Sequence, residues 1–176
     1  MTPTPRLATE RLVLRRWRAA DLAPMAAINA DPEVMRWIGD GSTRDEAATL
    51  AGIEAAELLW EERGFGLFAV EERATGRFAG FTGLAVPHFL PELLPAVEIG
   101  WRLDRACWGR GLATEAARAV LAYGFERCGL DRIVSVAQTG NDASLRVMAK
   151  LGMRRWRETV DPGSARPVQV HVATAP

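Results

Sequence analysis

The sequence predicts one mixed α/β domain, of the α+β kind, with a strand-helix-strand crossover at its centre. Three observations support this class. The 176 residues are 48% apolar and no Ser/Gly/Pro-rich linker divides them, so one core is expected over residues 1–176. Period-two apolar patterns, typical of strands, lie on both sides of a central stretch. In that stretch an extended segment runs through a glycine-rich turn into a helix-period apolar repeat.

The N-terminal half is expected to hold one strand, two helices and a hairpin. Asp21 precedes an apolar helical repeat and is expected to cap the first helix, which the Asp31-Pro32 pair ends. Ser42 or Thr43, with acidic residues three positions later, predicts a capping box for a long helix. The expected ranges are 9–18 for the strand, 22–30 and about 42–63 for the helices, and 65–71 with 77–86 for the hairpin.

The C-terminal half is expected to hold four strands and two helices, which brings the sheet to six or seven strands and the domain to about four helices. Strands are predicted at 95–104, 132–137, 153–160 and 168–172, and helices at 112–128 and 141–151. The apolar, proline-rich segment 87–95 reads as a loop. Such a loop beside a binding site often contacts ligand, so it is expected to shape a pocket.

Composition narrows the function classes. Twenty-two basic residues balance 22 acidic ones, so no overall field favours nucleic acid. The two cysteines, Cys107 and Cys128, have neither zinc-site spacing nor the number of a disulfide framework, so no metal is expected. No apolar run has the length of a signal peptide or a membrane span. A cytoplasmic protein without membrane or nucleic-acid partners is therefore expected.

The central turn spans residues 108–116 and contains Gly109 and Gly111 just before a helix. Backbone N–H groups, the positive end of the helix dipole and the Arg110 side chain are expected to point at one spot there, which favours a bound anion such as phosphate. The turn lacks the spacing of dinucleotide and P-loop motifs. Taken alone, it is equally consistent with a purely structural strand-to-helix connection.

Four segments together give a resemblance. Residues 98–101 (Glu-Ile-Gly-Trp), 108–116, 141–144 (Asn-Asp-Ala-Ser) and 150–153 (Lys-Leu-Gly-Met) occur in an order similar to that of the GNAT acyltransferase superfamily. Within it, the chain resembles the RimJ/RimL branch, which acetylates protein N-termini. The resemblance implies a mostly antiparallel mixed sheet, splayed between the strands of Glu98 and Ile133. It also implies acetyl-CoA as cosubstrate.

The resemblance places the cosubstrate on three parts of the chain. Backbone amides of the turn are expected to bind the pyrophosphate, and the edge of the strand before it to pair with the pantetheine arm. The residues so implied are Trp101, Arg102, Leu103, Trp108, Gly109, Arg110, Gly111, Leu112, Ala113, Thr114, Asn141 and Ser144. Most superfamily members have Gln or Arg at the position of Trp108. A packing role is the alternative for this residue, as is a helix N-cap for Asn141.

Glu98 is the candidate general base. Acyl transfer to an amine requires a group that accepts the amine's proton, and for this the pKa of a glutamate must rise to roughly 6–7. The alternative is a structural ion pair with Arg102 or Arg15. Ser144 is the candidate acid or thiolate stabiliser, or only a local cap. Many GNAT enzymes place a Tyr four residues beyond that serine, where this chain has Met148.

The predicted function is therefore acetyl transfer to a primary amine, with a protein N-terminal α-amine as the expected acceptor. At pH 7 an α-amine is about a tenth neutral, whereas a lysine is neutral only about once in ~2,500 molecules. A small-molecule amine, such as an antibiotic or a polyamine, is the alternative acceptor. A catalytically silent acyl-CoA-binding module is the alternative from another class. Monomer and homodimer remain open, and His88 and His171 are expected to have no role.

Overall fold

The structure is a computed structural model and describes residues 5–176. Within these residues the chain forms eight strands, five α-helices and three short 3₁₀ turns. The strands are β1 (Leu7–Ala8), β2 (Leu12–Arg15), β3 (Leu67–Glu72), β4 (Phe78–Ala85), β5 (Val97–Leu103), β6 (Arg132–Gln138), β7 (Arg154–Val160) and β8 (Pro167–Thr174). The helices are α1 (Leu22–Ala30), α2 (Pro32–Met35), α3 (Glu46–Arg63), α4 (Leu112–Glu126) and α5 (Asp142–Lys150).

The strands form one sheet in the order β1-β2-β3-β4-β5-β6-β8-β7. All neighbours are antiparallel except β5 and β6, which run parallel and are joined through α4. This confirms the predicted mixed sheet with a central crossover, although it has eight strands rather than six or seven. The additional strand is β1 at Leu7–Ala8, just before the expected range 9–18, and within that range only Leu12–Arg15 is a strand, β2, which pairs with β1.

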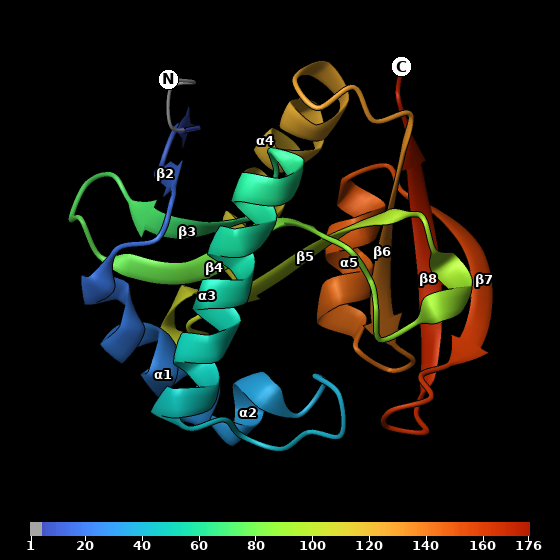
Figure 1. Cartoon of the computed structure of the whole chain (residues 1–176), viewed down its shortest axis with the longest axis horizontal. Coiled ribbons are helices and arrows are strands. Elements are labelled where there is room, and N and C mark those ends of the chain that lie inside the picture. The colour runs from blue at the N-terminus through green and yellow to red at the C-terminus, as the bar shows by residue number, and fades with distance from the viewer. Residues whose placement is uncertain (1–4) are drawn as a thin grey trace.

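The sheet splays open between β5 and β6. Only two residue pairs join these strands, Val97 with Ile133 and Glu98 with Val134. Where the pairing stops, the Ser135 hydroxyl donates to the Ile99 carbonyl at 3.0 Å. Figure 1 shows β6, β8 and β7 as one part of the sheet, with β5 leading back to the part formed by β1 to β4. The splay expected from the family resemblance is therefore present.

Helices α1 and α4 cover opposite faces of the sheet. Ile99 and Leu103 of β5 belong to the main core, which includes the buried residues of α4. Phe81 of β4, the partner of Arg102, packs instead with Met25 of α1. Because successive strand residues face opposite sides, the two packings lie on opposite faces. Among the helices of residues 5–176, none has both the length and the apolar character that crossing a bilayer requires.

Of two expected helix caps, one is wrong and the other is correct in position only. Helix α3 begins at Glu46, and its N-cap is Asp45, whose carboxylate accepts from the Ala48 N–H at 2.8 Å. Ser42 and Thr43 therefore lie outside the helix. Asp21 stands at the N-cap position of α1 but makes no capping hydrogen bond, because its carboxylate accepts from Arg15 at 2.7 and 2.9 Å. Asp21 thereby neutralises a buried guanidinium.

Candidate active site

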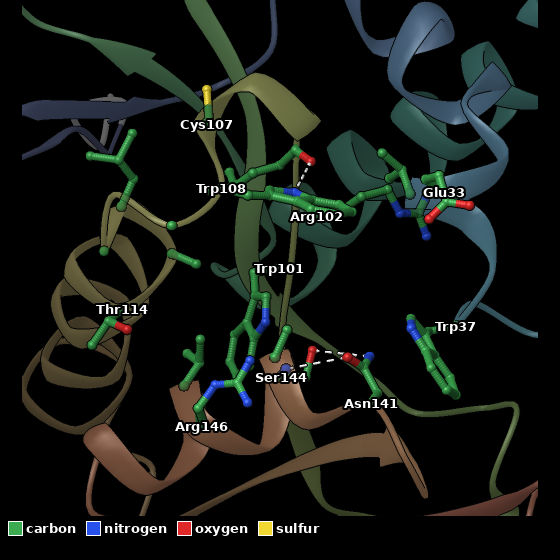
Figure 2. Close-up of a pocket in the computed structure, with 18 of the residues that line it drawn as sticks. Glu33, Trp37, Trp101, Arg102, Cys107, Trp108, Thr114, Asn141, Ser144 and Arg146 are labelled. Carbon is green, nitrogen blue, oxygen red and sulfur yellow. Dashed lines mark hydrogen bonds between the residues drawn. The ribbon is translucent and has the colours of Figure 1, made fainter.

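A cavity of about 360 Å³ lies at the open end of the splay. Its walls come from four segments: the chain around α2, the end of β5, the glycine turn with the start of α4, and α5 (Figure 2). It gathers most of the residues singled out from the sequence. These are Trp101, Arg102, Leu103, Trp108, Gly109, Gly111, Leu112, Ala113, Thr114, Asn141 and Ser144. Arg110 and Glu98 are not in its lining.

The glycine turn has a backbone that other residues rarely adopt. Gly109 has φ +72° and Gly111, the N-cap of α4, has φ +77°. A Cβ atom at Gly109 would meet nothing within 4 Å, so the backbone angle rather than lack of space favours glycine. The turn leads directly into Leu112, and the first residues of α4 line the cavity. The positive end of the α4 dipole therefore faces the cavity.

The Arg110 side chain does not point at the cavity, contrary to expectation. Its guanidinium forms an ion pair with Glu72 of β3, at 2.6 Å between Nη2 and Oε2. This contact is the main reason why the pKa of Glu72 lies below its usual value. Only the backbone amide of Arg110 remains for an anion. The sequence placed the residue correctly in the turn but gave no sign of its partner, 38 positions away.

Arg11 fixes the turn from the other side. Its Nε pairs with Glu115 in the first turn of α4 at 2.7 Å, and its Nη1 donates to the Arg110 carbonyl at 2.9 Å. The Thr9 hydroxyl donates to the same Glu115 carboxylate at 2.6 Å. The residues between β1 and β2 therefore hold both the turn and the start of α4. Because Arg11 binds the Arg110 carbonyl, that peptide group has a fixed orientation.

Two β5 residues turn their backbone groups toward the splay. Leu103 lies opposite Gly80 of β4, and the Asp104 N–H bonds to the Ala79 carbonyl. In antiparallel pairing this register turns the N–H and C=O of Arg102 toward β4, and those of Trp101 and Leu103 toward the splay. The Trp108 indole N–H donates to the Leu103 carbonyl at 3.0 Å (Figure 2). Trp108 is 48% exposed, so it occupies one hydrogen-bond acceptor of the β5 edge, the Leu103 carbonyl, rather than packing in the core.

Asn141 and Ser144 form a polar pair at the start of α5. Asn141 caps the helix, with its Oδ1 accepting from the Ser144 N–H at 3.3 Å. Its side-chain amide donates to the Ser144 Oγ at 3.2 Å, as Figure 2 shows. The serine hydroxyl keeps its own proton for donation into the cavity. Met148, where many related enzymes have Tyr, is 0% exposed in the main core.

Glu98 lies at the last residue pair of β5 and β6, behind the cavity rather than in its wall. Among residues 5–176 it has no ion pair. Of the two arginines considered as partners, Arg15 pairs with Asp21 and Glu71, and Arg102 bonds to Asn29. Burial raises the pKa of Glu98 to about 8, and a hydrogen bond from the Val136 backbone partly opposes the rise. This exceeds the 6–7 that the sequence argument required.

Sequence reasoning missed several residues around the cavity. The cavity is also lined by three residues of α5, Arg146, Val147 and Lys150. Their i, i+1 and i+4 spacing after the Asn141 cap places them on one face of the helix, and this pattern could have indicated that they line the cavity. Trp37, between α2 and α3, lines it as well. The segment 87–95, expected to shape a pocket, lines neither of the two cavities described here. Its buried leucines instead pack against β6 and β8 in a separate small core.

Cys107 is the one cysteine in the lining of this cavity. It is 1% exposed, and burial raises the pKa of its thiol. A thiol held in the protonated form is a poor nucleophile. The arrangement therefore favours direct transfer to a second substrate over a covalent intermediate on Cys107. Amides at the turn, a free strand edge and one serine hydroxyl can bind an extended anionic ligand along the cavity.

Comparisons with known proteins agree with this geometry. A family model described as an acetyltransferase (GNAT) domain matches residues 11–154. The uncharacterized N-acetyltransferase YoaA of Bacillus subtilis strain 168 is 30% identical over 151 residues, which are 86% of this chain and 84% of YoaA. The solved acetyltransferase of Agrobacterium tumefaciens strain C58 is 27% identical, with a TM-score of 0.84 over 99% of this chain and 97% of its own.

A third comparison concerns RimL, a ribosomal L7/L12 α-N-protein acetyltransferase solved with coenzyme A. It shares the fold at a TM-score of 0.79 over 97% of this chain and 98% of its own, with 15% identity. The family model covers most of the chain, and members of this family use acetyl-CoA. The protein therefore belongs to the GNAT acetyltransferase family, as an N-acetyltransferase, and it shares its fold with RimL.

Proposed function

We propose that this enzyme acetylates the α-amine of a protein N-terminus, with Glu98 as its general base. The observation that carries the proposal is the half-buried Glu98 at the last residue pair of β5 and β6, where the splay begins, with a pKa raised by desolvation to about 8. An α-amino group has a pKa of about 7.7–8.0, whereas a lysine has one of about 10.4. Proton transfer from an α-ammonium to this base is nearly balanced, whereas transfer from a lysine is uphill.

Acetyl-CoA supplies an activated acyl group, and the chain supplies position and proton transfer. The amides of Gly109 to Ala113 would bind the pyrophosphate, and the backbone groups of Trp101 with the N–H of Leu103, whose carbonyl Trp108 already occupies, would bind the pantetheine arm. Glu98 accepts the proton that the amine loses as its nitrogen bonds to the acetyl carbon. Because Glu98 stands behind the cavity, this transfer runs through a water molecule. As the carbon–sulfur bond breaks, its electron pair leaves on the sulfur as a thiolate, and the Ser144 hydroxyl donates a hydrogen bond that stabilises this charge.

The acceptor follows from chemistry and resemblance together. The match between the pKa of Glu98 and that of an α-amine supports a protein N-terminus. RimL, which shares the fold, acts on an N-terminal α-amine of a ribosomal protein. A polyamine fits less well, because Arg36, Arg146 and Lys150 line the cavity while Glu33 is the one carboxylate in its lining.

A coenzyme A release assay tests the proposal. The panel contains short peptides with free N-termini, the same peptides with blocked N-termini and one free lysine, and small diamines. We expect release with the free N-termini and little with the lysine peptides or diamines. Release with the diamines alone would replace the protein acceptor by a small-molecule one. Release with none, at saturating acetyl-CoA, would leave only the non-catalytic module.

A further inference from the structure

A second cavity, of about 210 Å³, lies between α1, α3 and the β4–β5 face. Trp17 and Phe81 form apolar walls, and Arg44 and Arg102 are its charged residues. No acidic residue lines it within the described chain. Arg102 also lines the first cavity, and Figure 2 shows it extending toward the wall that carries Glu33. A ligand in the first cavity can therefore reach the guanidinium at the entrance to the second.

The Arg102 guanidinium has no anionic partner among residues 5–176. Its Nη1 donates to the Asn29 side-chain oxygen at 2.6 Å, and its Nε is buried without any hydrogen-bond acceptor. Asn29 is neutral, and the Phe81 ring, whose centroid lies 5.3 Å from the guanidinium carbon, offers only a cation–π contact, so no anion balances the charge within the described residues. Burial and the charge of Arg44 lower the pKa of Arg102 to about 10, which still leaves the side chain charged at pH 7. A buried cation is costly unless an anion faces it.

The surroundings hold this charge in place. The Asn29 amide donates to the Thr49 hydroxyl at 3.0 Å, and that hydroxyl donates to the Asp45 carbonyl at 2.8 Å. This fixes the Asn29 oxygen as the acceptor for Arg102. With Nη1 engaged, the Nε and Nη2 edge of the guanidinium remains, and this edge matches the two oxygens of a carboxylate. The chain thus presents a fixed fork with no carboxylate of its own.

We propose that the acceptor carries a carboxylate that binds to Arg102 and Arg44, several ångströms from the reacting amine. This proposal deepens the proposed function and rests on it. Glu98, Gly100 and Arg102 share one face of β5, and the space at the missing Gly100 side chain is open, with nothing within 4 Å. At the rise of a strand, Glu98 and Arg102 lie about 13 Å apart.

This spacing selects the kind of acceptor. An α-amino acid is too short to reach both residues, because its amine and carboxylate are neighbours. A peptide advances about 3.3 Å per residue, so with its amine near Glu98 the backbone of the third residue lies about 7 Å along the strand. An acidic side chain of the peptide and the long Arg102 side chain must span the rest of the distance. The acceptor is therefore an N-terminus with Asp or Glu at position two or three. A small amine with a carboxylate at the far end has the same chemistry.

Matched peptide pairs test this proposal through kcat/KM for coenzyme A release. The pairs differ only by Glu or Gln at position two or three, and a second arm compares 6-aminohexanoate with its amide. We expect the parent enzyme to prefer the charged member by about 10- to 100-fold. A preference in the peptide arm identifies an acidic N-terminus, and one in the second arm alone identifies a small carboxylated amine.

Arg102→Gln and Arg44→Gln should reduce that preference, because they lower kcat/KM for the charged member more than for the neutral one. Arg63→Gln, at an exposed position of α3, should keep it. The Arg44 variant guards against a folding defect, since Arg44 is exposed. Release at equal rates from charged and neutral members would overturn the carboxylate site and leave the proposed function standing. No release from any amine would overturn both.

Discussion

The two ends of the catalytic region differ in the groups that face the ligand: backbone groups at one end and side chains at the other. At the end proposed to bind the cofactor, backbone groups of a few consecutive residues face the cavity, and the nearby charged side chains of Arg11 and Arg110 are paired with Glu115 and Glu72. At the end proposed to bind the acceptor, side chains from α1, α3 and β5 meet, and among residues 5–176 Arg102 has no anion beside it. The first arrangement suits a ligand that is the same in every reaction cycle, such as the cofactor. The second leaves a charge that a chosen acceptor can neutralise.

This difference has a physical consequence for specificity. Backbone amides at a helix N-terminus recognise phosphate without regard to what the rest of the ligand is. A guanidinium fork held by Asn29 discriminates by the charge and the position of its partner. Changes at the cofactor end should therefore affect all acceptors equally. Changes at the acceptor end should affect acceptors unequally.

The largest expected effect separates chemistry from cofactor binding. Glu98→Gln should lower turnover by about 10²–10⁴ and leave acetyl-CoA affinity nearly intact, because it removes the base but not the turn. Turnover comes from coenzyme A release and affinity from calorimetric titration. Glu158→Gln, on the exposed strand β7, is the control and should change neither. Unchanged turnover in the Glu98 variant would remove this residue from the mechanism.

The same variant should change stability with a defined sign. The folded-state pKa of Glu98 is raised from 4.5 to about 8, so its contribution to stability is full below about pH 4.5 and is lost as pH rises through 8. Glu98→Gln should therefore match the parent near pH 5. At pH 9 its free energy of unfolding should exceed that of the parent by up to a few kcal/mol. Denaturant melts at both pH values measure this, and a constant difference would contradict the burial of a titrating carboxyl.

A third expectation concerns rate and pH. A base with a pKa of about 8 is about a tenth deprotonated at pH 7 and about nine-tenths at pH 9. Accordingly, kcat at saturating substrates should rise about tenfold over that range and then level. The bound amine must titrate over much the same pH range. The pH profile of kcat for the parent enzyme is therefore compared with that of Glu98→Gln, which retains only the effect of the amine. Identical profiles would assign the whole pH effect to the amine.

The smallest effect probes how the turn is held. Arg11→Gln loses the contacts to Glu115 and to the Arg110 carbonyl, and it should weaken acetyl-CoA binding about fivefold with kcat nearly unchanged. The modest size reflects the exposure of Arg11, whose side chain is 45% accessible. Arg154→Gln is an exposed control. An equal loss in kcat would mean that Arg11 also orders the reacting centre.

The glycine turn and β5 could be placed from the sequence because their signals are local, whereas their role in binding the cofactor stays a prediction. Gly109 and Gly111 have positive φ angles, which favour glycine, and their place directly before a helical repeat is visible in the sequence. The alternation along 95–104 likewise identified β5 and its two faces. The hairpin and the Asn141 cap of α5 are confirmed for the same reason.

The partners of charged side chains could not be predicted in this way. Arg110 was expected at the anion site and instead pairs with Glu72, and Asp21 was expected as a cap and instead pairs with Arg15. Arg102 meets Asn29 from 73 positions away. Such contacts depend on how the elements pack, and a single sequence carries no local pattern for them. The arrangement of charges around Arg102 could therefore be identified only from the folded structure.

The most direct test is an acetyl-CoA titration followed by thermal unfolding of the parent and of Gly111→Trp. Gly129→Trp is the matched control, because Gly129 follows the other end of α4 with φ +64° and no atom within 4 Å of the added Cβ. Acetyl-CoA should raise the melting temperature of the parent and of the Gly129 variant but not that of the Gly111 variant. No shift in the parent, or a full shift in Gly111→Trp, would contradict the assignment of the turn as the cofactor anchor.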